Sequence, residues 1–162
     1  MITPQIITLA PIDVLYVRKE GAYMKSAAEA WSVLIGFAYE QKMKHGKNLM
    51  GEEAMTLGIG HDNPDITDED HIRFDACISR DDPTVQPQGE IQVKTIDGGR
   101  YAMFVHKGRY ENLKTTYDTI GDWIIESGVQ VRDVPMFEKY LNRDPRRTKP
   151  ENLRTEIYIP ID

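Results

Sequence analysis

The sequence predicts an α+β fold in which one domain of 162 residues is built from two related β-β-α-β-β halves. Three observations predict this architecture: an internal repeat, paired short segments rich in β-branched residues, and two segments whose apolar residues recur at helical spacing. We expect half 1 to cover about residues 1–82 and half 2 about residues 90–162, with pseudo-twofold symmetry, an antiparallel sheet and two main helices. The seam between such halves is a natural place for a central ligand cleft.

Two stretches of the chain resemble later stretches in the same order. Val14–Tyr23 resembles Tyr101–Tyr110 at an offset of 87 residues, and Met55–Ile78 lies without a gap over Met136–Ile159 at an offset of 81 residues. Identities are few, but the two matches keep their order and their offsets differ by only six residues. The sequence therefore indicates an internal duplication.

Each half is expected to begin with two short strands. Gln5–Leu9 and Asp13–Arg18 form the first pair, and Ile91–Ile96 and Arg100–His106 form the second. The second pair is joined by Asp97–Gly99, whose sequence Asp-Gly-Gly predicts a hairpin turn because both glycines adopt positive φ at little cost.

A helix is expected after each pair of strands. The first runs from Lys25 to about His45 and ends at Gly46, and the second runs over Glu111–Ser127 before Gly128. The apolar stripe of the first helix consists of Ala27, Trp31, Leu34, Ile35 and Ala38, and that of the second consists of Leu113, Tyr117, Ile120 and Ile124.

Two further strands are expected to complete each half. They are Met55–Ile59 with Ile72–Ile78 in the first half, and Met136–Leu141 with Leu153–Ile161 in the second. Polar loops connect them, and no linker rich in Pro or Ser separates the halves. A single domain follows.

Composition excludes several classes of protein. The chain carries 20 Lys+Arg against 26 Asp+Glu, a net charge of −6, which disfavours direct nucleic-acid binding. Its single cysteine, Cys77, excludes an intramolecular disulfide. No apolar run approaches the length of a membrane span, and the N-terminus does not resemble a signal peptide. We expect a cytoplasmic protein that does not bind membranes.

Glu156 is the candidate charged residue of a ligand site. Alternation along the last strand places Leu153, Thr155, Ile157 and Ile159 on one face, and Arg154, Glu156 and Tyr158 on the other. If that second face points outward, Glu156 is an ordinary solvated residue. If it points into the seam, the carboxylate would attract amines and quaternary ammonium ions.

Five aromatic residues could complete such a site. They are Trp31, Trp123, Phe104, Tyr110 and Tyr140. Aromatic faces add about 0.5–2 kcal/mol of cation–π attraction per good contact. The alternatives remain open that Trp31 simply fills the core and that Tyr110 anchors the start of a helix.

Other chemistries have little support in the sequence. The acidic segment His61–His71 lacks the ligand spacing of calcium or zinc sites, and a solvated loop is the simpler interpretation. Cys77 lies in an expected strand and is interpreted as a buried thiol. We therefore expect no catalytic residue, no metal and no cofactor.

Five short motifs resemble the GyrI-like (gyrase-inhibitor-like) family in their order along the chain. They are Gly60–Pro64, Arg73–Cys77, Gly98–Ala102, Phe137–Asn142 and Thr155–Ile161. That family includes effector-binding domains of AraC-type and MerR-type transcription regulators. The resemblance implies a duplicated fold with a central cleft for amphipathic, often cationic, small molecules. It also implies that Glu156, on the final strand, is the ligand's charge partner and that Tyr110 lines the cleft.

The resemblance implies a stand-alone effector or multidrug-binding module, since no helix-turn-helix domain is expected in this chain. Two alternatives stay open: a small hydrolase that uses the same glutamate, and a protein that inhibits gyrase. DNA gyrase or a separate DNA-binding regulator would then be the protein partner. The sequence predicts neither the natural ligand nor the oligomeric state.

Overall fold

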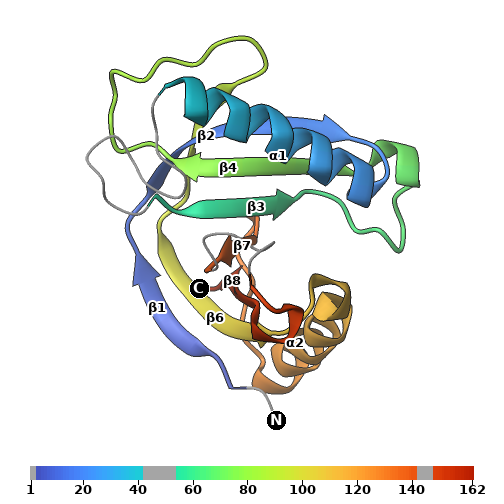
Figure 1. Ribbon diagram of the computed structural model, residues 1–162. Helices are drawn as coiled ribbons and strands as arrows, with labels where there is room; N and C mark the ends of the chain where they lie inside the picture. Colours follow the sequence, from blue (N-terminus) through green and yellow to red (C-terminus); the bar gives the residue numbers. More distant parts are fainter. Residues whose placement is uncertain (1–2, 42–53, 142–147) are drawn as a thin grey trace. The chain divides into compact units, whose positions relative to one another are not determined.

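Figure 1 shows the computed structural model of the chain, which describes residues 3–41, 54–141 and 148–162. These residues form eight strands, two α-helices and three short 3-10 helices. They divide into two compact units: the N-terminal unit is Pro11–Asp97, and the C-terminal unit combines Met1–Ala10 with Gly98–Asp162. The predicted α+β class, with antiparallel strands and two main helices, is confirmed.

The N-terminal unit is a four-stranded antiparallel sheet with one helix. In sheet order its strands are β3 (Thr56–Gly60), β4 (Arg73–Ser79), β2 (Ile12–Glu20) and β5 (Gln92–Ile96), and its helix is α1 (Tyr23–Glu40). A 3-10 helix, Glu69–His71, precedes β4. The two predicted strands that correspond to β3 and β4 are confirmed, as is their pairing.

Helix α1 covers one face of this sheet. Its buried residues are Ser26, Ala30, Leu34, Phe37 and Ala38, and they pack against strand residues such as Val17, Phe74 and Ala76. Three of the five are small, which allows a helix to lie close to a sheet. The interior of the N-terminal unit is therefore filled by its own side chains.

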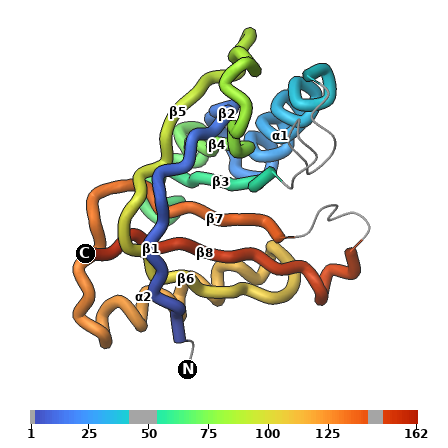
Figure 2. The backbone as a smooth tube through the Cα atoms, turned by 90° about the vertical axis from the view of Figure 1, so that its left-hand side faces the viewer, coloured from blue at the N-terminus to red at the C-terminus, as the bar shows by residue number. Residues whose placement is uncertain are grey.

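The C-terminal unit has the same plan. In sheet order its strands are β1 (Gln5–Leu9), β6 (Gly99–Lys107), β8 (Arg154–Pro160) and β7 (Phe137–Tyr140), and its main helix is α2 (Leu113–Ser127). Two 3-10 helices, Tyr110–Asn112 and Pro150–Asn152, precede α2 and β8. Figure 2 shows β6, β8 and β7 lying side by side, as their pairing requires.

Helix α2 covers its sheet differently from α1. Only Leu113 and Ile120 are buried on it, and partly buried aromatic side chains, Tyr117 and Trp123 among them, pack between the helix and the core. The helix ends at Gly128, which adopts the left-handed conformation (φ 70°) and confirms the predicted stop. Tyr117 and Trp123 therefore occupy part of the layer between α2 and its sheet.

The pairing of β2 with β4 in the N-terminal unit corresponds to the pairing of β6 with β8 in the C-terminal unit, with the offsets of 87 and 81 residues found in the sequence. Arg18 on β2 lies opposite Asp75 on β4, and Val105 on β6 lies opposite Glu156 on β8. The two pairs are therefore equivalent positions, as the sequence match predicts.

The gapless alignment of the two halves is wrong by one residue where it compares β3 with β7. Gly58 lies opposite Ala76 in the N-terminal unit, whereas Glu138 lies opposite Ile157 in the C-terminal unit. The equivalent of Glu138 is therefore Gly58, and not Leu57 as the gapless match implies. One unit has no side chain at the position where the other carries a carboxylate.

The predicted hairpin at Asp97–Gly99 is also wrong. Strand β5 pairs with β2, and β6 pairs with β1, so the turn connects strands of different units. Gly99 has φ 123°, and a Cβ there would lie 3.0 Å from the Arg132 guanidinium. The glycine serves this close approach, because Arg132 binds the carbonyl oxygens of Gly98 and Arg100.

Helix α1 begins at Tyr23, two residues before the predicted start at Lys25. The predicted end near His45 and the stop at Gly46 lie outside the described residues. Helix α2 keeps the predicted end at Ser127, and its first predicted turn is a 3-10 helix.

Candidate functional site

Glu138 is a carboxylate on the helix-covered face of the C-terminal unit. It lies opposite Ile157, which in turn lies opposite Phe104, and side chains opposite one another in antiparallel strands share a face. Ile157 and Phe104 belong to the buried cluster that packs against α2. The Glu138 side chain therefore enters the layer between the sheet and α2.

The surroundings of Glu138 disfavour its charged form. Its Oε2 is buried and has no hydrogen-bond partner among the described residues. Burial raises the pKa of Glu138 to about 7, and a hydrogen bond from the Tyr117 side chain only partly opposes this effect. A carboxyl group with this pKa is partly protonated at neutral pH, and a nearby cation would favour its ionised form.

Four of the predicted aromatic residues lie in the C-terminal unit and meet there in two pairs. The rings of Tyr110 and Tyr140 meet edge to face with centroids 5.9 Å apart, and Phe104 meets Trp123 in the same way at 5.3 Å. Burial raises the pKa of Tyr110, and the charge of Glu138 adds to the shift. Tyr110 and Glu138 therefore interact electrostatically.

The difference between the two units explains why the site lies in only one of them. Gly58 and Gly60 of β3 stand at the positions of Glu138 and Tyr140 of β7 by pairing register. Two glycines leave these positions of β3 without side chains, and a Cβ at Gly60 would meet nothing within 4 Å. In the C-terminal unit a carboxylate and a phenol occupy the same two positions.

Glu156 lies on the opposite face of the same sheet. Its neighbours across the strands are Val105 and Lys139, and the Tyr158 hydroxyl donates a hydrogen bond of 2.8 Å to Glu156 Oε1. Leu153, Thr155, Ile157 and Ile159 are all buried, and on the face of Glu156 the side chain of Tyr158 is buried too. The structure does not bring Glu156 together with Phe104 or Tyr140, since the sheet separates them.

Trp31 lies in the other unit. It is partly buried and packs against the core cluster under α1. The structure groups Phe104, Trp123 and Tyr110 in one cluster. Tyr110 in turn contacts Tyr140 and interacts electrostatically with Glu138, a residue for which the sequence predicted no role.

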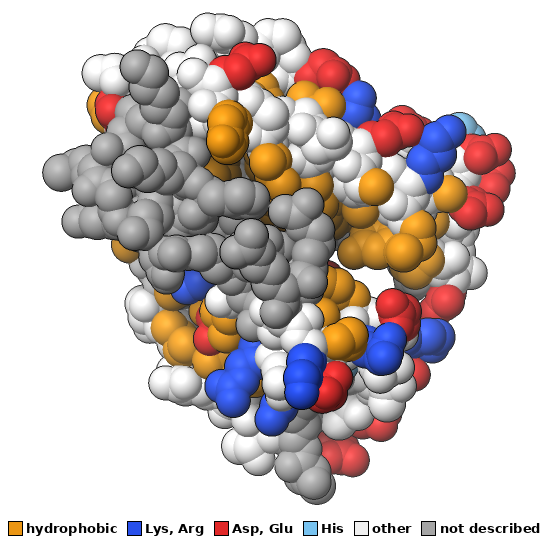
Figure 3. Space-filling model, viewed as in Figure 1, with side chains coloured by type: hydrophobic (Ala, Val, Ile, Leu, Met, Phe, Trp, Pro, Cys, Tyr) orange, Lys and Arg blue, Asp and Glu red, His pale blue; other side chains and the backbone are white. Residues whose placement is uncertain are grey.

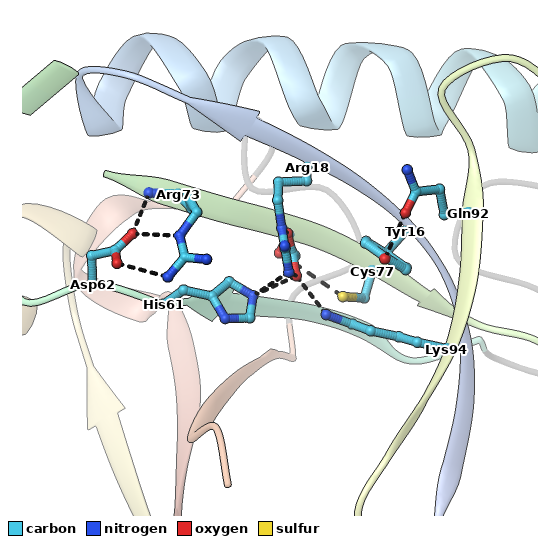
Figure 4. Close-up of polar contacts among 9 residues, drawn as sticks. Tyr16, Arg18, His61, Asp62, Arg73, Cys77, Gln92 and Lys94 are labelled. Atoms are coloured by element: carbon cyan, nitrogen blue, oxygen red, sulfur yellow. Dashed lines mark hydrogen bonds and ion pairs between the residues drawn. The ribbon is translucent and has the colours of Figure 1, made fainter. Parts of the chain in front are cut away.

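A second polar cluster lies on the N-terminal unit, on the sheet face away from α1 (Figure 4). Asp75 is fully buried and accepts hydrogen bonds from Arg18 (2.7 and 3.0 Å), His61 (2.6 Å) and Lys94. Burial alone would raise the pKa of Asp75, but these three partners hold it well below its usual range. Both carboxylate oxygens are used, so the cluster serves to compensate a buried charge.

Cys77 lies beside this cluster and is fully buried, which confirms the interpretation of a buried thiol. Burial raises its pKa to about 12, so the thiolate required for nucleophilic attack is disfavoured. In the His61–His71 segment, Arg73 holds Asp62 in an ion pair of 2.9 Å. No group of three or more potential metal-binding side chains occurs within the ranges that the structure describes.

Exposed apolar side chains occur on helix α1, visible in Figure 3. The large exposed apolar residues of this helix are Tyr23, Met24, Ile35 and Tyr39. In the described ranges neither helix is long and apolar enough to cross a bilayer.

Known proteins resemble this chain over most of its length. Residues 2–162 match the sequence profile of the GyrI-like small molecule binding domain. The probable transcriptional regulator YgiV of Escherichia coli (strain K12) is 29% identical over 110 residues, which cover 67% of this chain and 68% of YgiV. A DNA gyrase inhibitor of Erwinia billingiae (strain Eb661) is 26% identical over 144 residues, which cover 87% of this chain and 85% of the inhibitor.

A solved structure has the same fold. SAV2435 bound to tetraphenylphosphonium superposes with a TM-score of 0.68 at 19% sequence identity, and the match covers 98% of this chain and 93% of that one.

Proposed function

Because the chain belongs to the GyrI-like small molecule binding domain family, we propose that it binds amphipathic cations beneath α2, with Glu138 as their charge partner. The observation that carries the proposal is the buried Glu138 Oε2, which has no hydrogen-bond partner among the described residues. Glu138 takes the role that the sequence analysis predicted for Glu156.

Electrostatics favour a cationic ligand at this position. A buried carboxylate without a partner is costly, and a cation beside it would remove most of that cost. The ring of Tyr110 interacts with Glu138, and the rings of Tyr140, Trp123 and Phe104 lie in the same unit. Such rings would offer a ligand apolar area and cation–π attraction of about 0.5–2 kcal/mol per good contact. Tetraphenylphosphonium, the cation in the SAV2435 structure, has this combination of charge and aromatic surface.

The proposed role is that of an effector-binding or drug-sequestering module. The names of its relatives, a probable transcriptional regulator among them, agree with a domain that senses small molecules. A chain of this kind would act through its ligand-bound state, either by lowering the free ligand concentration or by contacting a partner protein.

The test is calorimetric titration of the chain with tetraphenylphosphonium at about pH 8, where Glu138 would be ionised. Glu138→Gln keeps the shape of the side chain and removes its charge, so we expect affinity to fall roughly tenfold or more. Glu156→Gln is the matched control on the opposite face of the same strands, and its affinity should stay within about twofold of wild type. Equal affinity of wild type and Glu138→Gln, or a large loss only in Glu156→Gln, would contradict the proposal.

A hydrolase is the second candidate, because a carboxyl group with a pKa near 7 suits general acid–base catalysis. Glu138 would activate a water molecule, with Tyr110 positioning the substrate. Mass spectrometry after incubation with strained electrophiles distinguishes the two functions. Product that forms with wild type but not with Glu138→Gln favours the hydrolase, and intact compound favours the binding module.

A further inference from the structure

We propose that the Thr155 hydroxyl is a second polar contact for the ligand, so that the Glu138 site selects cations bearing N–H groups over cations without them. This inference rests on the proposed function and specifies its ligand class. It begins from two buried oxygen atoms on neighbouring strands that have no hydrogen-bond partner among the described residues: Glu138 Oε2 and Thr155 Oγ1.

The two oxygens belong to the same face of the same pair of strands. Tyr140 on β7 lies opposite Thr155 on β8, two residues along the ladder from the pair of Glu138 and Ile157. Glu138 and Thr155 are therefore diagonal neighbours, a relationship in which Cα atoms are about 7–8 Å apart and long side chains make contact. Thr155 is 0% exposed and lies in the layer that α2 covers.

The polar neighbour of Thr155 on β6 is already engaged. His106 lies directly opposite it on β6, but His106 Nδ1 is 2.7 Å from Thr116 Oγ1 and its Nε2 is 2.9 Å from the Arg109 carbonyl oxygen. Both ring nitrogens thus have partners other than Thr155. The unpaired hydroxyl is left facing the same layer as the Glu138 carboxylate.

A buried hydroxyl without a partner costs free energy, and few such groups persist in folded proteins without a reason. A secondary ammonium ion carries one positive charge and two N–H donors, and both oxygens can accept from it. A quaternary ammonium or phosphonium ion satisfies only the charge and leaves the Thr155 hydroxyl unpaired. A hydrogen bond from a charged donor is strong enough to change affinity roughly tenfold or more.

The experiment compares two ligands that differ only in N–H groups, dibenzylammonium and dibenzyldimethylammonium. Each is titrated calorimetrically into wild type, Thr155→Val, Thr155→Ser and Glu138→Gln. Valine matches the shape of threonine without its hydroxyl, and serine keeps the hydroxyl. We expect Thr155→Val to lower the affinity for dibenzylammonium roughly tenfold and the affinity for the quaternary ion by less than about twofold. Thr155→Ser should retain the preference of wild type for dibenzylammonium.

The outcomes separate this inference from the proposed function. If Thr155→Val binds both ions as wild type does, the hydroxyl has no ligand role and the inference is overturned, even if an internal water pairs with it. If Glu138→Gln leaves both affinities unchanged while Thr155→Val is selective, the charge role of Glu138 fails and the inference stands. If wild type binds tetraphenylphosphonium but neither dibenzyl ion, the inference is overturned and the proposed function stands.

Discussion

Glu138 on β7 lies directly opposite Ile157 on β8, on the face of the sheet that α2 covers. Glu156, the residue before Ile157, lies on the other face, where Tyr158 donates a hydrogen bond to it. Two carboxylates on neighbouring strands therefore face different environments. Of the two, only the Glu138 carboxylate has a buried oxygen without a hydrogen-bond partner among the described residues.

The first prediction concerns stability against pH. The pKa of Glu138 rises from an ordinary 4.5 to about 7 in the folded protein, so between these values the folded state binds more protons than the unfolded state. The contribution of Glu138 to the free energy of unfolding is therefore most favourable below about pH 4.5, and about 3 kcal/mol of it is lost as pH rises through 7.

Glutamine does not ionise, so Glu138→Gln should gain stability relative to wild type as pH rises across this window. Urea unfolding of both proteins at about pH 5 and about pH 8 measures the difference. Glu156→Gln is the matched substitution on the other face. A stability difference between Glu138→Gln and wild type that does not grow with pH would contradict the burial of Glu138.

The second prediction concerns the pH dependence of cation binding. Because a cation favours the ionised carboxylate, tetraphenylphosphonium should bind wild type roughly tenfold more tightly at about pH 8 than at about pH 6. This cation does not titrate, so the change reports the protein alone. The affinity of Glu138→Gln should lack this tenfold rise, and a rise of the same size in the variant would assign the titration to another group.

The third prediction concerns the stability of Thr155 variants. Thr155→Val removes a buried hydroxyl that has no partner among the described residues, so the free energy of unfolding should stay equal or increase by up to about 1 kcal/mol. Thr155→Ser removes a buried methyl group and should lower it by about 1 kcal/mol. Thermal and urea unfolding test whether Thr155→Val is more stable than Thr155→Ser. The reverse order would show that the hydroxyl has a structural partner.

The fourth prediction concerns the buried charge of the N-terminal unit. Asp75→Ala leaves Arg18, Lys94 and His61 without their shared carboxylate, and the free energy of unfolding should fall by about 3–5 kcal/mol. The pKa of Asp75 lies below its ordinary 3.8, so its contribution is present above that value and is lost as pH falls below it.

The gap between wild type and Asp75→Ala should therefore narrow on acidification below about pH 4. Asp62→Ala removes the partner of the exposed Arg73 side chain and should cost less than Asp75→Ala at neutral pH. Urea unfolding from neutral pH to below about pH 4 measures the free energy of unfolding of both variants. A larger loss in Asp62→Ala would contradict the structural role assigned to Asp75.

Much of the fold could be predicted because its signals are local. Apolar spacing predicted both helices, and alternation predicted which residues between Leu153 and Ile159 share a face of the last strand. The repeat offsets agreed with the pairing of β2 with β4 and of β6 with β8. The hairpin at Asp97–Gly99 was wrong because a turn sequence describes a local bend and does not choose the strand that pairs next.

The site could be predicted only in part. Tyr110, Trp123, Tyr140 and Phe104, which were predicted to line a ligand site, meet in two pairs of rings, whereas Glu156, the carboxylate predicted with them, lies on the other face of the sheet. Strand β7 has four residues, too few for alternation to show which of its faces is buried. A signal was nevertheless present in the sequence, since Glu138 shares its face with Tyr140 in any strand.

By itself the sequence determined which residues form helices and strands, which side chains share a strand face, and the family to which the chain belongs. Only the tertiary structure decided which face α2 covers and therefore which carboxylate is buried. Glu138 and Glu156 both lie on short strands, but burial depends on what packs above each face. That packing is set by contacts between residues distant in the chain, so local patterns do not contain it.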